Sequence, residues 1–262
     1  MNDESIIDFG EYIEFQIKRR FGIITLNRVH KSNSFTLEQL KNLKKALDYC
    51  QKNEKIKGVI LTANGTSFST GMDLKDITKL DYEGVKDLER TAASICNLLY
   101  NGKPSICAVN GRALGEGVVF TACCDYRITI KDSFFQMPEI NSAIFPGTSC
   151  VILFSKIIGI SWTKKILMFA EKIGAKKALE IGLIDEIVDS KEKLLEIALE
   201  RAKFLGTKNQ IVLNAIKLLS NHLHDLPFKQ AYEFEKLGSD WYKFNRKEEL
   251  LEILRGKFNW VI

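Results

Sequence analysis

The segment that most constrains this fold runs from Lys103 to Asp125, where a buried strand leads through a glycine-rich turn into an apolar helix. We expect the strand at 105–109 and the helix at about 116–124. Gly111, Gly115 and Gly117 allow a second backbone or a ligand to approach the turn closely. The first N–H groups of the helix would carry partial positive charge and could hold an anion or an oxyanion. A tight connection that binds nothing fits the same pattern.

Strands and helices alternate along roughly the first 190 residues, which predicts an α/β body with right-handed crossovers and mostly parallel strands. Thr36 is the expected N-cap of a helix over 37–52, and Gln39 completes a capping box. The other expected elements are a strand pair over 11–26, strands at 56–62 and 125–130, a small-residue loop at 63–74 and a helix at 83–101.

After Pro146 the sequence is predominantly helical, and only 184–188 is strand-like. Helices are expected at 149–158, 162–172, 175–181, 191–205, 211–222 and 228–242. We therefore divide the chain into a body at 1–190 and a C-terminal helical region at 191–262.

The composition is that of a soluble globular protein, with 45% hydrophobic and 27% charged residues among 262. The formal charge of +5 comes without a basic arm, so we expect no nucleic-acid partner. The N-terminus is acidic and no apolar run could span a bilayer, so we expect a cytoplasmic protein without a membrane anchor. Six cysteines without a C-x-x-C pair indicate buried thiols, and the three histidines are expected on the surface.

The loops that follow two of the expected strands could supply groups for catalysis. The loops after Thr62 and Val109 each offer backbone N–H donors near a glycine, and two converging donors would form an oxyanion hole. A P-loop is excluded because G-x-x-x-x-G-K-[ST] is absent. A dinucleotide fingerprint is excluded because the glycines are spaced G-x-x-x-G-x-G.

Glu139 is the strongest candidate for a general base. It lies in the largely apolar stretch Phe-Phe-Gln-Met-Pro-Glu-Ile at 134–140, where loss of solvent would raise its pKa. A loop carboxylate that caps a backbone amide is the alternative interpretation.

Four blocks of the sequence resemble the enoyl-CoA hydratase/isomerase (crotonase) superfamily. They are Phe-Ser-Thr-Gly-Met-Asp-Leu at 68–74, Ala-Val-Asn-Gly-Arg-Ala-Leu-Gly-Glu-Gly at 108–117 followed by Cys-Asp-Tyr-Arg at 124–127, Phe-Gln-Met-Pro-Glu-Ile at 135–140 with Phe-Pro-Gly at 145–147, and Ala-Leu-Glu-Ile-Gly-Leu-Ile-Asp-Glu-Ile-Val at 178–188. Their order and spacing hold from about residue 12 to the C-terminus.

The resemblance implies a spiral of ββα units, a C-terminal helical region that forms a homotrimer or a dimer of trimers, and an acyl-CoA thioester substrate. It implies no metal and no cofactor apart from the coenzyme A of the substrate. The oxyanion hole of the family falls on the N–H groups of Met72 and Glu116. The implied substrate-binding positions are Arg28, Lys31, Ser32, Ser34, Thr70, Asp73, Leu74, Lys75, Gly115, Val119, Pro138, Pro146, Gly147 and Lys257.

One position departs from the hydratase pattern. Hydratases of this family use two glutamates, of which the second matches Glu139 and the first falls on Val119. Several Δ3,Δ2-enoyl-CoA isomerases keep an apolar residue there and work with one glutamate. The sequence therefore favours an isomerase in which Glu139 moves a proton from C2 to C4.

Glu116 leaves a second interpretation open. It precedes Val119 by three residues on the same helical face, so it could replace the missing carboxylate of a hydratase. It could also be favoured only by the helix dipole. A protein that binds acyl-CoA without turnover, or serves as a scaffold, is the alternative outside the enzymes.

Overall fold

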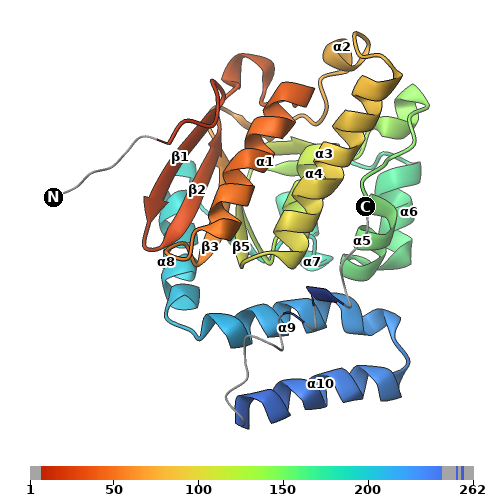
Figure 1. Ribbon diagram of the computed structural model, residues 1–262. Helices are drawn as coiled ribbons and strands as arrows, with labels where there is room; N and C mark the ends of the chain where they lie inside the picture. Colours follow the sequence, from red (N-terminus) through yellow and green to blue (C-terminus); the bar gives the residue numbers. More distant parts are fainter. Residues whose placement is uncertain (1–6, 244–251, 253–254, 257–262) are drawn as a thin grey trace, which may run out of the picture.

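The computed structural model describes residues 7–243, 252, 255 and 256. The described residues form two β-sheets, and helices pack around them (Figure 1). The large sheet has the order β1-β2-β3-β5-β7-β10. Its strands are β1 (Ile13–Lys18), β2 (Phe21–Leu26), β3 (Gly58–Ala63), β5 (Ser105–Val109), β7 (Tyr126–Ile130) and β10 (Glu186–Val188).

The small sheet has the order β4-β6-β8-β9, with β4 (Ser67–Ser69), β6 (Arg112–Leu114), β8 (Phe134–Gln136) and β9 (Ile173–Gly174). Three successive units each place one strand in the large sheet and the next strand in the small sheet: β3 and β4, β5 and β6, then β7 and β8. A helix follows each pair. This arrangement confirms the predicted α/β spiral of ββα units.

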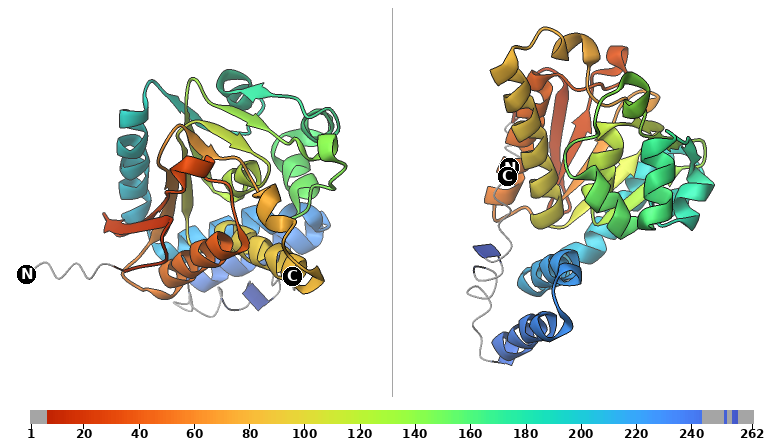
Figure 2. Two further views of the ribbon diagram at one scale, coloured as in Figure 1. Left: turned by 90° about the horizontal axis from the view of Figure 1, so that it is seen from above. Right: turned by 90° about the vertical axis from the view of Figure 1, so that its right-hand side faces the viewer.

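The helices are α1 (Leu37–Lys52), α2 (Leu74–Ile77), α3 (Tyr82–Asn101), α4 (Glu116–Cys123), α5 (Cys150–Ile157), α6 (Gly159–Met168), α7 (Ala175–Glu180), α8 (Lys191–Gly206), α9 (Gln210–His222) and α10 (Phe228–Lys243). Short 3₁₀ turns are η1 (Val29–Lys31), η2 (Glu139–Ser142) and η3 (Leu223–Asp225). Figure 2 shows α9 and α10 outside the body, below its sheets and helices.

The parallel strands β2, β3 and β5 of the large sheet are buried on both faces, as strands of parallel sheets usually are. Because neighbouring residues of a strand point to opposite faces, Val59 and Leu61 pack with α1 and α3 while Ile60 packs with α8. The predicted Thr36 capping box of α1 is confirmed, since Thr36 accepts from the N–H of Gln39 and Gln39 accepts from that of Thr36.

The strands of the small sheet differ from the sequence-based prediction, which was wrong here. The stretches at 63–74 and 111–115 were expected as a loop and a turn, yet they contain β4 and β6; β8 and β9 were not predicted either. Two or three residues are too few to show an alternating hydrophobic pattern, so only pairing across the chain reveals these strands.

The six cysteine thiols are free and buried, as predicted. His222 corrects a prediction, because it is only 4% exposed and its Nε2 lies 2.7 Å from Asn101 Oδ1. The prediction placed His222 on the surface because it lies at a helix end, but this end of α9 faces α3. Among the described helices, none is both long and apolar enough to cross a membrane.

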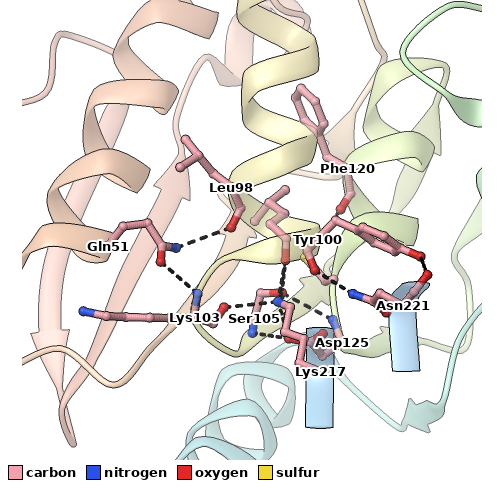
Figure 3. Close-up of polar contacts among 11 residues, drawn as sticks. Gln51, Leu98, Tyr100, Lys103, Ser105, Phe120, Asp125, Lys217 and Asn221 are labelled. Atoms are coloured by element: carbon pink, nitrogen blue, oxygen red, sulfur yellow. Dashed lines mark hydrogen bonds and ion pairs between the residues drawn. The ribbon is translucent and has the colours of Figure 1, made fainter. Parts of the chain in front are cut away.

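Lys217 anchors α9 to the body (Figure 3). Its ammonium group is buried and donates to Leu99 O at 2.6 Å, Lys103 O at 3.2 Å and Asp125 Oδ2 at 2.7 Å. Leu99 lies in the last turn of α3, where the helix leaves its carbonyl groups without helical partners. The Lys217 ammonium group therefore donates a hydrogen bond to a free carbonyl in the last turn of α3 and also forms an ion pair with Asp125.

We predict that Lys217→Met lowers the free energy of unfolding by about 3 kcal/mol. This is the lower end of the usual cost of a broken buried pair, because the Asp125 side chain is 29% exposed. Urea unfolding would measure the loss. The double variant with Asp125→Asn should recover part of it, and an unchanged midpoint in the single variant would contradict this role.

Candidate active site

The candidate site forms where the loop after β4 meets the loop between β6 and α4. A Cβ atom added to Gly71 would lie 3.0 Å from Leu114 O and 3.3 Å from Glu116 N. Gly71 and Gly115 both have positive φ, at 78° and 51°, which other residues rarely adopt. The two loops therefore touch backbone to backbone, and glycine permits both the contact and the conformation.

The N–H groups of Met72 and Glu116 lie at this junction. Phe35 fixes the first loop, because its N–H donates to Gly71 O and its carbonyl accepts from Asp73 N, both at 2.8 Å. Glu116 is the first residue of α4, so its N–H has no acceptor within the helix. Across the described residues, neither N–H donates to a backbone or side-chain acceptor. The structure thus brings together the two donors predicted for an oxyanion hole.

Glu139 reaches the same junction from β8 through the start of η2. A Cβ atom at Gly115 would lie 2.6 Å from Glu139 Oε1, so this carboxylate lies against the glycine beside the predicted hole. Its other oxygen, Oε2, is buried and has no hydrogen-bond partner within the described part of the chain. Burial raises the pKa of Glu139 above its ordinary value of 4.5. The predicted general base is therefore desolvated and partly unpaired.

The side chain of Glu116 is also buried, with 7% exposure. Its Oε2 accepts a hydrogen bond from Thr148 Oγ1 at 2.9 Å, and Cys96 Sγ lies 3.9 Å from Oε1. Burial is the main reason why the pKa of Glu116 is raised to about 7. The hydrogen bond from Thr148 lowers this pKa, whereas repulsion from Glu139 raises it further. Val119, three residues further along α4, is 1% exposed and apolar.

Thr148 and Cys96 are site residues that sequence reasoning missed. They are 32 and 20 residues from Glu116 in the chain, and no motif links them to it. Thr148 and Ser149 are both in the left-handed region, at φ 52° and 63°. Such strained backbone often accompanies functional sites.

Several of the residues that were predicted to bind substrate lie beside Met72 and form hydrogen bonds with one another. Arg28 Nη1 donates to Asp73 Oδ2 at 2.7 Å and to Ser34 Oγ at 2.9 Å, and this guanidinium lowers the pKa of Asp73. Thr70 N donates to Ser32 O at 3.2 Å. Asp73 also caps α2 through Lys75 N. These contacts shape the loop that carries Met72.

The remaining predicted positions differ in their placement. Lys31, Leu74 and Lys75 are exposed around this loop, while Gly147 is exposed and Pro146 half-buried in the segment that leads to Thr148. Pro138 directly precedes Glu139. Lys257 lies outside the described residues.

The arrangement suits acid–base chemistry next to a developing negative charge. Two N–H donors can bind an oxyanion, and a desolvated carboxylate beside them can remove a proton. Within the described residues, no group of three or more His, Cys, Asp or Glu side chains could hold a metal ion.

A model of the enoyl-CoA hydratase/isomerase family matches residues 16–249. A Bacillus subtilis protein that carries the same hydratase/isomerase description is 32% identical over 218 residues, which are 81% of this chain and 82% of that protein. A short-chain-enoyl-CoA hydratase of Clostridium acetobutylicum is 29% identical over 248 residues, 91% of this chain and 92% of the hydratase.

The crystal structure of an enoyl-CoA hydratase from Bacillus anthracis superposes with a TM-score of 0.83 at 26% identity, covering 88% of this chain and 90% of that one. The matched family region includes both glycine loops and Glu139.

The raised pKa of Glu116 predicts a pH-dependent stability. Because the folded state holds this proton up to a pKa of about 7 and an ordinary glutamate releases it near 4.5, the folded state binds more protons between these values. Stability from this group is therefore fully present below pH 4.5 and is lost as pH rises to about 7.

We expect Glu116→Gln to be about as stable as the parent at pH 5 and more stable at pH 8, by roughly 3 kcal/mol. Urea unfolding at both pH values measures the difference. Glu180→Gln on the exposed surface of α7 is the control, and an equal response of both variants would argue against a buried Glu116 carboxylate.

Proposed function

The chain belongs to the enoyl-CoA hydratase/isomerase (crotonase) family, and we propose that it isomerises a 3-enoyl-CoA thioester to the conjugated 2-enoyl-CoA. Glu139 acts as the single acid and base. The N–H groups of Met72 and Glu116 bind the thioester oxygen.

In this mechanism Glu139 removes a proton from C2, and the electron pair of that C–H bond passes to the thioester oxygen as an enolate. When the carbonyl re-forms, a double bond forms between C2 and C3 while the one between C3 and C4 opens. C4 then takes the proton back from Glu139. Each hole donor would stabilise the enolate by about 3–4 kcal/mol.

Val119 is the observation that carries this proposal. It is buried on α4 at the position where hydratases of the family carry their first glutamate. A valine can neither hold a water molecule nor move a proton, and loss of such a group typically costs about 10²–10⁴ in rate. Isomerisation adds no water and needs one proton carrier, which Glu139 supplies.

Hydration is the second candidate, and Glu116 favours it. Its buried carboxylate has a pKa of about 7, so a large share is protonated at neutral pH, and Glu139 lies near enough to repel it. Two carboxyl groups in unequal environments are a common arrangement for acid and base roles. In this alternative Glu139 and Glu116 together would add water across C2 and C3.

We also propose the remaining features implied by the family: an acyl-CoA thioester substrate, no separate cofactor, a cytoplasmic location and assembly as a homotrimer or dimer of trimers. Large apolar side chains on α6, α9 and the start of α10 support assembly, since Met168, Ile216 and Phe228 are 61%, 57% and 86% exposed. A body at 1–190 and a helical region at 191–262 remain our proposed division.

A paired assay separates the two reactions. The purified protein is given a 3-enoyl-CoA and, separately, a 2-enoyl-CoA, while the absorbance of the conjugated thioester is followed. We expect absorbance to rise with the first and to stay constant with the second. A fall with the second would instead support hydration, and Glu116→Gln should then lose that activity. Binding of both thioesters without any absorbance change would favour a non-catalytic acyl-CoA protein.

We predict that Glu139→Gln lowers turnover by about 10²–10⁴ and leaves the affinity for coenzyme A nearly unchanged. The amide has the shape of the carboxyl group but cannot accept the C2 proton. Steady-state rates and calorimetric binding of coenzyme A measure the two effects, with Glu180→Gln as the surface control. Turnover within tenfold of the parent would remove Glu139 from the mechanism.

A further inference from the structure

The turn between β1 and β2 has an unusual composition. Lys18 pairs with Phe21, so Arg19 and Arg20 alone form the turn, and their φ angles are 50° and 67°. Two-residue hairpin turns with positive φ at both positions favour Asn-Gly or Gly-Gly, because most side chains are strained in this region. Both arginines are exposed. Backbone strain of this kind commonly marks a functional segment, and here it presents two guanidinium groups at the tip of a hairpin.

Further cations lie on the same edge of the large sheet. The strands β2, β3 and β5 are parallel, so they begin at one edge, where Lys57 N donates to Arg20 O at 2.6 Å. Helix α8 ends beside the hairpin, because a Cβ atom at Gly206 would lie 3.8 Å from Arg19 O. Figure 1 shows the turn and the end of α8 at the lower left of the body. The cationic side chains of this basic edge are Lys18, Arg19, Arg20, Lys52, Lys55, Lys57, Lys203 and Lys208.

Positive charge is concentrated on the basic edge. The segments 17–20, 52–57 and 203–208 contain eight of the 38 lysine and arginine residues but only one of the 33 acidic residues, Glu54. Without these segments the formal charge of the chain would be −2 instead of +5. None of the eight cationic side chains forms an ion pair with a described carboxylate. Helix ends attract cations, which accounts for the lysines at the ends of α1 and α8, but no helix ends at the β1–β2 turn.

Exposed apolar side chains accompany the cations. Ile17 directly precedes Lys18 and is 42% exposed, and Phe204 in the last turn of α8 is 62% exposed. This composition suits the interface of a lipid bilayer, where cations meet phosphate groups and apolar side chains enter the headgroup region. A single-stranded nucleic acid would instead stack its bases on uncovered aromatic rings. The Phe204 ring is covered, because Lys208 Nζ lies 4.0 Å from its centre.

We propose that the basic edge docks this protein reversibly on a surface of anionic phospholipids. The candidate active site is built from segments that follow the carboxyl ends of β3 and β5, whereas the basic edge lies at the amino ends of these strands. Docking by this edge therefore leaves the site free to exchange its substrate. The contact requires no membrane-spanning segment. It goes beyond the proposed isomerase activity and does not depend on it.

Sedimentation with vesicles tests the proposal. We expect the parent to bind phosphatidylcholine vesicles that contain about 30% phosphatidylserine, to ignore pure phosphatidylcholine, and to dissociate as the salt concentration rises. The double variant Arg19→Asn with Arg20→Gly should bind about 25-fold more weakly, because each cation near an anionic surface contributes about a factor of five. The same variant supplies the Asn-Gly sequence that this turn favours, so its Tm should rise by roughly 2–4 °C. Loss of binding would then not reflect loss of the fold.

Lys164→Gln with Lys176→Gln is the matched control. These lysines are exposed on α6 and α7, so this variant loses the same two charges away from the basic edge. It should bind the anionic vesicles as the parent does. An equal loss in both double variants, or no binding of the parent to anionic vesicles, would overturn the proposal. Binding of the parent to single-stranded RNA without binding to vesicles would also overturn it, in favour of a nucleic-acid partner.

Discussion

The candidate site depends on the backbone contact between two loops at Gly71 and Gly115. A side chain at either glycine would collide with the opposite loop or with Glu139, and both residues have a positive φ. The contact brings the N–H groups of Met72 and Glu116 to one junction although the two residues belong to different ββα units. The sheet pairing of β4 with β6 supports the contact, because these parallel strands deliver the loops side by side.

The position of the loops explains the unequal environments of the two carboxylates. Glu139 is half-buried against Gly115, whereas Glu116 points between α3 and the segment at Thr148 and is buried on every side. Full burial raises the pKa of Glu116 to about 7. Helix α4 thus contributes its N–H to the predicted oxyanion hole and holds a second, weakly acidic carboxyl group nearby.

Helix α9 of the C-terminal region contacts residues near this site that lie far from α9 in the sequence. Lys217 satisfies the end of α3 and pairs with Asp125, and Asn221 fixes Tyr100. Because α3 also carries Cys96, one helix links the Glu116 carboxylate to the α9 contact. The docking of α9 therefore fixes both Tyr100 and the end of α3.

The sequence by itself determined the α/β class, most helices, the α1 capping box and the family, because these depend on local periodicity, caps and short motifs. It also singled out Gly115, Met72, Glu116 and Glu139. Only the tertiary structure decided where the side chain of Glu116 points, that Thr148 and Cys96 hold it, and that His222 is buried. The strands of the small sheet also emerged only there. Their physical basis is pairing and burial between residues far apart in the chain, which no local pattern encodes.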